Sequence, residues 1–228
     1  MDNLKQKIQY LNRRIEKAAL KSGRENTDIL LVAVSKTVDS ASVQMAYNCG
    51  IRNFGENRVQ ELLKKIDSVP QARWHMIGRL QTNKVKELLG KVSLIHSLDR
   101  WKLAEELDRR GKMAGIEVPA LLQVNISGEE QKAGVSSAEV KDFLDSAGQF
   151  SSLRIQGFMT IAPMTDNVEE TRPVFRELFE LKQNLSKRRY NNVELKYLSM
   201  GMSQDYEVAI EEGANIIRVG SALFAHDA

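Results

Sequence analysis

The most regular feature of the sequence is an alternation of short apolar runs with longer amphipathic segments. Runs rich in aliphatic and β-branched residues occur at 29–35, 51–54, 73–77, 92–96, 118–126, 154–159, 195–199 and 215–219. Between them, apolar residues recur every three or four positions, at roughly 40–49, 57–67, 82–90, 99–114, 136–147, 167–189 and 204–213. The first pattern is typical of strands buried on both faces, and the second is typical of amphipathic helices. We therefore predict eight strands separated by seven helices.

This order of elements also predicts the fold. Strands that alternate with helices pair in parallel, because each helix carries the chain back across the sheet. Eight such units in 228 residues are typical of a (β/α)8 TIM barrel, an α/β fold. The alternative is an open, doubly wound sheet. That fold usually has a glycine-rich turn after its first strand, and the corresponding stretch VSKTVDS contains no glycine.

An additional helix is predicted before the first strand. Residues 2–22 have a narrow apolar stripe and end at Ser22-Gly23, which is a helix stop signal. The stripe has no aromatic residues that would insert into a membrane, so we expect residues 1–23 to pack on the barrel. No segment rich in Pro, Gly or Ser interrupts the chain. We therefore expect one domain over residues 1–228.

Composition and charge exclude several classes of protein. The 33 basic residues face 30 acidic ones, and the only dense basic run is Lys187-Arg188-Arg189, so no nucleic-acid partner is expected. A single cysteine excludes an intramolecular disulfide and a cysteine-based metal cluster. The sequence has no apolar stretch of membrane-spanning length and no signal peptide. The expectation is a cytoplasmic protein with no membrane partner.

Candidate chemistry lies where the strands end, since TIM barrels place their sites at the carboxyl ends of the strands. The stretch SMGMS follows the seventh strand, and VGS follows the eighth. Gly201 and Gly220 allow the backbone to approach a ligand closely. Ser203 is predicted to be the N-cap of a helix that begins at Gln204. Loops after strands seven and eight often bind phosphate in this fold. We predict an anion site there, with plain helix capping and a tight turn as the alternative.

Lys36 ends the first strand and is the candidate nucleophile. An apolar barrel mouth keeps more of a lysine amine neutral, which suits Schiff-base formation. A phosphorylated sugar carbonyl and pyridoxal 5′-phosphate (PLP) both fit. Alternatively, Lys36 reaches solvent or pairs with Glu56. Arg218 points to the same side of its strand as Gly220 and could donate to an unprotonated pyridine nitrogen, which would weaken the ring as an electron sink. A salt bridge within the barrel is the alternative for Arg218.

The histidines do not indicate a metal site. His75 and His96 alternate with apolar residues, and no third histidine is near them in the sequence. We expect His75 to be a hydrogen-bonded residue of the pocket or the core rather than a proton shuttle.

Six stretches near the strand ends together resemble one known family. They are LLVAVSKT, NFGENRVQE, WHMIGRLQTNK, QVNISGEEQKAG, GFMTIAP and SMGMSQDYEVAIEEGANIIRVGSALF. In this order they are similar to the pyridoxal phosphate homeostasis proteins, which are single-domain relatives of the alanine racemase N-terminal barrel. The resemblance runs from about residue 29 to residue 224, so it includes every predicted strand.

This resemblance implies roles for individual residues. It implies that Lys36 holds PLP as an internal aldimine and that Arg218 lies near the pyridine nitrogen. Asn57 would lie close to the ring, and His75 and Met200 would line the ring's pocket. The phosphate would be held by the loops after strands seven and eight, through Met202, Ser203, Gly220 and Ser221.

The resemblance also implies a function without catalysis. Racemisation needs a base on each face of the substrate, and two-domain racemases supply the second as a tyrosine with the help of a C-terminal β-domain. The sequence lacks that domain, and Tyr206 is expected on the first turn of the phosphate-side helix. We therefore expect no catalytic residues, and a monomeric carrier or buffer that serves vitamin B6 homeostasis by giving PLP to apo-enzymes. The alternatives are a weak PLP-dependent enzyme, such as an amino-acid racemase, and an interaction module that senses PLP.

Overall fold

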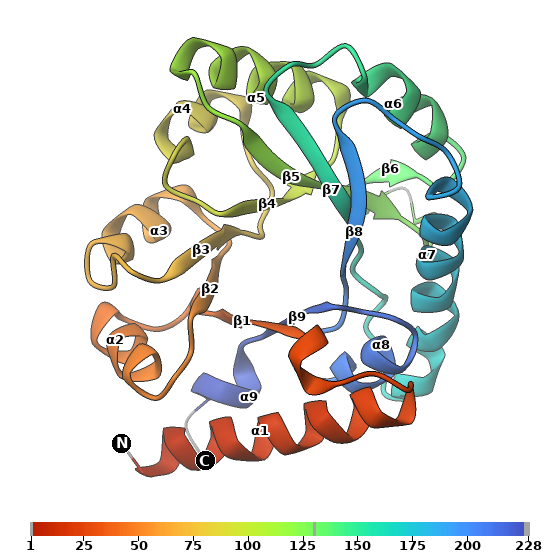
Figure 1. Cartoon of the computed structure of the whole chain (residues 1–228). Helices are drawn as coiled ribbons and strands as arrows, with labels where there is room; N and C mark the ends of the chain where they lie inside the picture. Colours follow the sequence, from red (N-terminus) through yellow and green to blue (C-terminus); the bar gives the residue numbers. More distant parts are fainter. Residues whose placement is uncertain (1, 130, 226–228) are drawn as a thin grey trace.

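The computed structural model describes residues 2–129 and 131–225 and forms a closed barrel of parallel strands (Figure 1). Its eight strands are β1 (Leu30–Val34), β2 (Asn53–Glu56), β3 (Arg73–Met76), β4 (Leu94–Leu98), β5 (Val118–Asn125), β7 (Leu153–Met159), β8 (Val193–Ser199) and β9 (Ile216–Val219). The strand order is β4-β3-β2-β1-β9-β8-β7-β5, and pairing of β4 with β5 closes the barrel. The predicted TIM barrel is therefore confirmed.

Helices follow the strands and surround the barrel (Figure 1). They are α1 (Asp2–Lys21), α2 (Ser40–Asn48), α3 (Val59–Ile66), α4 (Val85–Leu88), α5 (Trp101–Ala114), α6 (Val140–Ala147), α7 (Arg172–Leu185), α8 (Tyr206–Glu211) and α9 (Ser221–Phe224). Short elements that the periodicity did not predict are the 3-10 turn η1 (Asn26–Asp28), the strand β6 (Val135–Ser136), and α9. The predicted helices at 82–90 and 167–189 begin with the 3-10 turns η2 (Thr82–Lys84) and η3 (Val168–Thr171). Two to four residues are too few to display a hydrophobic period.

Two strands are shifted by two residues toward the C-terminus relative to the prediction. The second strand was expected at 51–54 and the fourth at 92–96, whereas β2 is Asn53–Glu56 and β4 is Leu94–Leu98. In both cases the prediction followed the apolar residues, and the observed strand continues into buried polar ones. Glu56 and Ser97 are both fully buried. These polar side chains belong to strands because their hydrogen-bond partners lie on neighbouring elements, which periodicity cannot show.

The interior of the barrel is layered. Strand side chains alternate between the interior and the surrounding helices. A compact apolar layer fills the interior, with one residue from each of five strands: Val32, Leu94, Leu121, Met159 and Ile216. A layer of buried polar side chains lies two residues further along the strands, toward their carboxyl ends. It includes His96 and Arg218. The interior is therefore closed below the candidate site.

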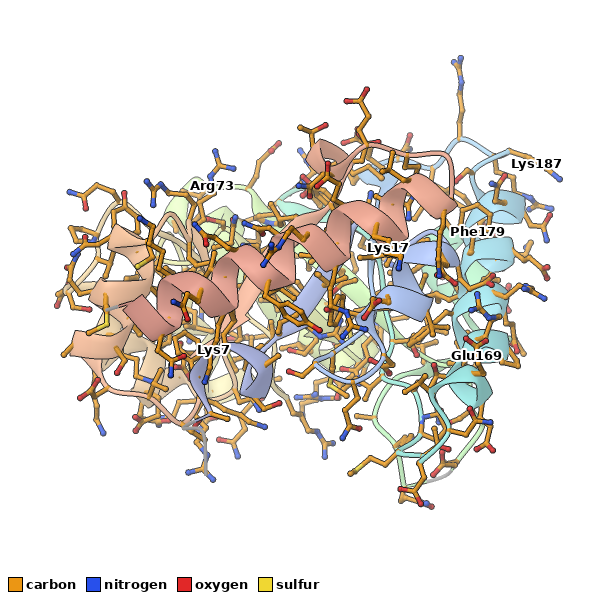
Figure 2. All side chains as sticks on the ribbon, turned by 90° about the horizontal axis from the view of Figure 1, so that it is seen from below. Lys7, Lys17, Arg73, Glu169, Phe179 and Lys187 are labelled. Atoms are coloured by element: carbon orange, nitrogen blue, oxygen red, sulfur yellow. The ribbon has the colours of Figure 1, made fainter. Side chains whose placement is uncertain are left out.

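The N-terminal helix α1 covers the flank of the barrel beside β1 and β9, outside the short helices α8 and α9 (Figures 1 and 2). Its apolar stripe is buried there, including Ile8, Leu11 and Ile15. Lys21 at its last turn pairs with Glu211 of α8 at 2.8 Å. In the described part of the chain, no helix has the length and apolar character needed to span a membrane.

Candidate functional site

Lys36 lies directly after β1, at the carboxyl end of the barrel. Its side chain is exposed, so the desolvation argued from its place at the end of a buried strand does not hold here. Lys36 is not paired with Glu56, which removes one of the alternatives considered for it. The residue before it is rigid: Ser35 is fully buried, and its N–H donates to Gly55 O at 3.0 Å. The backbone that presents Lys36 is thus fixed while its amine stays accessible.

A buried ion pair holds this end of β1. Lys65 of α3 donates to the carbonyl oxygen of Ser35 at 2.7 Å and to Glu56 Oε1 at 2.6 Å. The Ser35 hydroxyl donates to the same carboxylate oxygen at 2.7 Å. Lys65 is 4% exposed and Glu56 is 0% exposed. A charge of this kind is tolerated in a protein interior only when it is paired, so the cluster specifies how α3 packs against the end of β1.

Two cavities open at the carboxyl end of the barrel and share Val34, Lys36, Met202 and Arg218. We call the first the β8–β9 cavity; its volume is about 330 Å³, and it also includes Ser203, Gln204, Asp205, Gly220 and Ser221. We call the second the β2–β5 cavity; its volume is about 320 Å³, and it also includes Asn57, Arg79, Asn125 and Lys132. The fold therefore brings together seven of the nine predicted site residues, and it leaves His75 and Met200 outside both cavities.

The loops after β8 and β9 are joined through Ser203, in a way that corrects one prediction. Ser203 was predicted to be the N-cap of a helix beginning at Gln204, but α8 begins at Tyr206 and Asp205 precedes it. The Ser203 hydroxyl instead accepts from Gly220 N at 3.2 Å and Ala222 N at 3.4 Å. Ser203 therefore accepts hydrogen bonds from the segment after β9 and does not cap the helix that follows it in sequence. Because its oxygen only accepts in these two bonds, its own hydrogen remains available to a ligand.

Unpaired backbone donors line the β8–β9 cavity. Across the described residues, no protein acceptor is present for the backbone N–H groups of Ser203, Gln204 and Ser221. The Met202 N–H is already used, since it donates to Asp205 Oδ1 at 2.6 Å. Unpaired N–H groups and hydroxyls facing one cavity are a suitable environment for an anion with several oxygens. Met202 is therefore less suited to the phosphate role than its neighbours.

Gly201 makes this loop possible. Its φ is +90°, and a Cβ there would lie 2.6 Å from Ala209 Cβ and 2.9 Å from the Cα of Tyr206. Replacement of Gly201 with alanine should lower the free energy of unfolding by about 3 kcal/mol, since backbone strain and a clash with α8 add together. Gly23→Ala is the matched control. Its φ is +69° with open space around it, so it should cost only about 1 kcal/mol. Equal losses in urea unfolding would contradict the steric argument.

Arg218 forms the wall between the two cavities. It is 4% exposed, and burial lowers its pKa to about 10, so it remains charged at neutral pH. Its guanidinium donates from Nη1 to Ser199 Oγ at 2.6 Å and from Nη2 to the carbonyl oxygen of Thr160 at 2.9 Å. Neither partner is a carboxylate, and Arg218 forms none of the salt bridges found among the described residues, so the alternative role considered for it is not supported. The side chain is oriented by two neutral acceptors.

His75 and Met200 lie in the core. Met200 is fully buried, and its N–H donates to Ile216 O at 3.1 Å. His75 is 3% exposed and forms hydrogen bonds with His96 and Asn53. The expectation that His75 is a hydrogen-bonded residue agrees with this position. Its predicted contact with a bound ring is not supported by its place below the cavities.

Both interior histidines are held neutral. Burial lowers the pKa of His75 from 6.5 to about 4, and burial also lowers the pKa of His96 well below its ordinary value. Below pH 6.5, these histidines therefore bind protons in the unfolded chain but not in the folded chain. The free energy of unfolding must consequently fall on acidification. Each histidine should contribute a loss of about 1 kcal/mol per pH unit between pH 6.5 and 5, because the unfolded imidazole is half protonated at the first pH and almost fully protonated at the second. Urea unfolding at pH 7.5, 6.5 and 5.5 measures this, and a flat profile would contradict it.

Asn57 is held at the opening of the β2–β5 cavity by close packing. A Cβ on Gly78 would lie 2.3 Å from the carbonyl oxygen of Asn57, so only glycine fits beside it. The Asn57 side chain is exposed and lines the same cavity as Lys36. Arg79, next to Gly78, adds a positive charge to this wall and lies 3.4 Å from the buried Asp99.

Tyr206 is turned away from the two cavities. It is 5% exposed and lines a separate cavity between α1 and α8, together with Tyr10 and Arg14. Burial raises its pKa to about 12. Within the described residues, no tyrosine or histidine lines either cavity that contains Lys36. No group of three or more His, Cys, Asp or Glu in the same residues could hold a metal ion.

The arrangement can bind an anionic, carbonyl-bearing aromatic molecule. It offers an accessible primary amine, unpaired N–H donors for an anion, and a fixed guanidinium between them. Residue-by-residue reading missed the Glu56–Lys65 pair and the role of Ser199, since both depend on contacts between distant segments. Their only sequence signal was a polar residue inside or just beyond an apolar run.

Comparison with known proteins supports one family throughout. A family model described as the alanine racemase N-terminal domain matches residues 3–227. The pyridoxal phosphate homeostasis protein of Aquifex aeolicus is 46% identical over 224 residues, which are 97% of each chain. The protein of the same name from Helicobacter pylori is 40% identical over 231 residues, covering 98% of this chain and 99% of the relative.

Solved structures agree with this result. PipY of Synechococcus elongatus, solved with PLP bound, is 37% identical and superimposes with a TM-score of 0.80, covering 87% of this chain and 93% of PipY. A protein of unknown function from Bifidobacterium adolescentis is 33% identical, with a TM-score of 0.91 and coverage of 97% and 94%. Alanine racemase of Clostridium difficile, at 13% identity and a TM-score of 0.74, shares the fold and is covered over 56% of its length.

Proposed function

The chain belongs to the pyridoxal phosphate homeostasis proteins, and we propose that it binds PLP through Lys36 and delivers it to apo-enzymes as an intracellular carrier. The observation that carries this proposal is the β8–β9 cavity itself. One cavity contains the Lys36 amine, unpaired backbone N–H groups, and the Arg218 guanidinium. These are the three kinds of group that an aldehyde, a phosphate and a pyridine nitrogen require. The PLP-bound structure of PipY supports the choice of ligand.

The residues present fit PLP group by group. PLP supplies an aldehyde that condenses with a primary amine, and Lys36 is the exposed amine that both cavities share. Ser203 and Ser221 would bind the phosphate through their N–H groups and hydroxyls, and Gly220 keeps that loop close to β1 because a Cβ would lie 3.2 Å from Val34. Arg218 would donate to the ring nitrogen, and Asn57 would contact the ring from the β2–β5 side.

Exposure of the site favours delivery over catalysis. Lys36 is exposed, and the adjoining residues Met164 and Met202 are 92% and 37% exposed. An acceptor protein can therefore approach the opening. The same exposure would leave a carbanion unprotected from water. A permanently charged arginine at the ring nitrogen weakens PLP as an electron sink.

The alternative function is weak racemisation on the same site. The related fold of alanine racemase favours it, and racemisation would need a second base opposite Lys36. Tyr206 is unsuited to this role because it lies under α1. We expect no turnover of alanine above the rate given by free PLP.

The carrier proposal is tested by the kinetics of transfer. Protein loaded with PLP is mixed with an apo-enzyme that gains activity on receiving PLP, and release into solution is measured separately with a phosphatase that destroys free PLP. The carrier proposal predicts a transfer rate that rises with acceptor concentration and exceeds the release rate. A transfer rate limited by release would reject direct delivery. Failure to take up PLP at all would reject the binding site.

A further inference from the structure

A chain of hydrogen bonds crosses the interior of the barrel directly below the cavities and ends on Arg218. We call it the interior polar chain; its members, in order, are Asn53, His75, His96, Ser199 and Arg218. The Ser199 hydroxyl oxygen lies 2.6 Å from Arg218 Nη1 and 2.8 Å from His96 Nδ1. His96 Nε2 lies 2.9 Å from His75 Nδ1, and His75 Nε2 lies 3.3 Å from Asn53 Oδ1. All five residues are buried.

The arginine gives this chain a direction. Arg218 can only donate, so Ser199 Oγ accepts from it and has its own hydrogen for His96 Nδ1. A neutral His96 then carries its proton on Nε2 and donates to His75 Nδ1. His75 in turn carries its proton on Nε2 and donates to the Asn53 side-chain oxygen. In this direction, each donor in the interior polar chain has one acceptor.

The opposite direction leaves a buried donor unsatisfied. If His96 donated from Nδ1, Ser199 would accept from both neighbours, and its hydroxyl hydrogen would have no acceptor among the described residues. Asn53 would also have to turn its amide to donate to His75. Buried polar groups are nearly always paired, so this arrangement is disfavoured.

We propose that Ser199, His96 and His75 are positioning residues that hold the Arg218 guanidinium as a fixed donor, and so make the site select ligands with an acceptor nitrogen in the ring. This inference rests on the proposed function, since it places that nitrogen next to Arg218. Four consecutive hydrogen bonds and the Thr160 carbonyl leave the guanidinium no other orientation in which these partners stay satisfied. A bound ring must therefore place an acceptor atom where the guanidinium can donate to it, because the guanidinium cannot reorient.

The direction of the chain is tested on the protein without ligand. Long-range ¹H–¹⁵N correlation spectra of histidine-labelled protein at pH 7 report which ring nitrogen carries the proton. We expect both His75 and His96 to be neutral and protonated on Nε2. Protonation of either residue on Nδ1 would overturn the proposal, because Ser199 would then lose its role as donor to His96, or Asn53 its role as acceptor from His75. This result does not depend on PLP binding.

The role in selection is tested with two ligands. One is PLP, and the other is its analogue in which a ring C–H replaces the nitrogen. Ser199→Ala should weaken PLP binding about tenfold while changing binding of the analogue less than twofold, because only PLP uses the donor that Ser199 orients. Equal weakening of both ligands, or of neither, would overturn the proposal. A wild-type protein that binds neither ligand would instead reject the proposed function.

Two further variants keep this test decisive. His96→Phe retains a ring of similar size and removes both nitrogens, so it should reproduce the Ser199→Ala pattern if that variant fails to fold. Ile216→Val is the matched control, since it loosens the apolar layer on the strand that carries Arg218 without removing a hydrogen bond. It should change the affinities for the two ligands by the same factor. A ligand-dependent effect of Ile216→Val would overturn the assignment to the polar chain.

Discussion

Lys36→Ala should abolish covalent retention of PLP and weaken binding on the order of 100-fold, which corresponds to about 3 kcal/mol. Lys36 is the lysine that both cavities of the barrel mouth share, and its backbone is held by the buried cluster around Ser35. Without its amine, the ligand keeps only contacts with the phosphate and the ring nitrogen. Equilibrium dialysis measures the affinity, and absorption spectroscopy measures the loss of the protein-bound band above 400 nm that an imine of PLP would give.

Lys36→Arg distinguishes amine chemistry from charge. Arginine keeps the positive charge at the barrel mouth but stays protonated, so it cannot form a covalent bond to the aldehyde. We expect it to lose the absorption band as completely as Lys36→Ala, with a smaller loss of affinity. Retention of the band in either variant would show that another amine holds PLP and would reject the role given to Lys36.

Lys65→Met should be the most destabilising single substitution near the site, at about 3–5 kcal/mol. It leaves the fully buried Glu56 carboxylate without its cation, and Glu56 Oε2 already has no hydrogen-bond partner. It also removes the ammonium that holds the Ser35 carbonyl oxygen. Because these groups fix the residue before Lys36, PLP binding should weaken as well. The free energy of unfolding in urea measures the first effect.

The neighbouring residue provides the control. Lys64 is exposed and pairs with the exposed Glu61 at 2.9 Å, so Lys64→Met should change stability by less than about 0.5 kcal/mol. The double variant Lys65→Met with Glu56→Leu removes both charges and should recover much of the loss. If Lys65→Met were no more destabilising than Lys64→Met, the buried pair would not hold the end of β1.

The fold could be predicted because its main signal is local. Seven amphipathic helices and eight apolar runs are visible in the sequence, and parallel pairing follows from their alternation. The limits of the elements were less predictable. Glu56 and Ser97 look like loop residues, yet they lie in strands because their partners are on other elements. Hydrophobic periodicity indicates where apolar side chains are buried, but it does not indicate where polar side chains are buried in pairs.

The sequence predicted which strand ends carry the site residues. It did not predict the hydrogen bonds and exposure of those residues in the folded protein. The barrel brings the ends of β1, β8 and β9 together, which places Lys36, Ser203 and Gly220 at one cavity. Exposure of Lys36 was one of two alternatives that the sequence could not decide between, and the cross-loop bonds of Ser203 were not predicted, because both depend on side-chain positions in the folded protein. Ser203 looked like a helix cap from its neighbours in sequence, whereas Gly220 and Ala222 are its partners in space.

Borohydride reduction followed by peptide mapping shows whether one lysine holds PLP. The protein is incubated with one equivalent of PLP, reduced, digested and analysed by mass spectrometry. We expect one added phosphopyridoxyl group per chain, on the peptide that contains Lys36, and competition by excess inorganic phosphate. Label spread over exposed lysines, or a single label on another lysine, would contradict it.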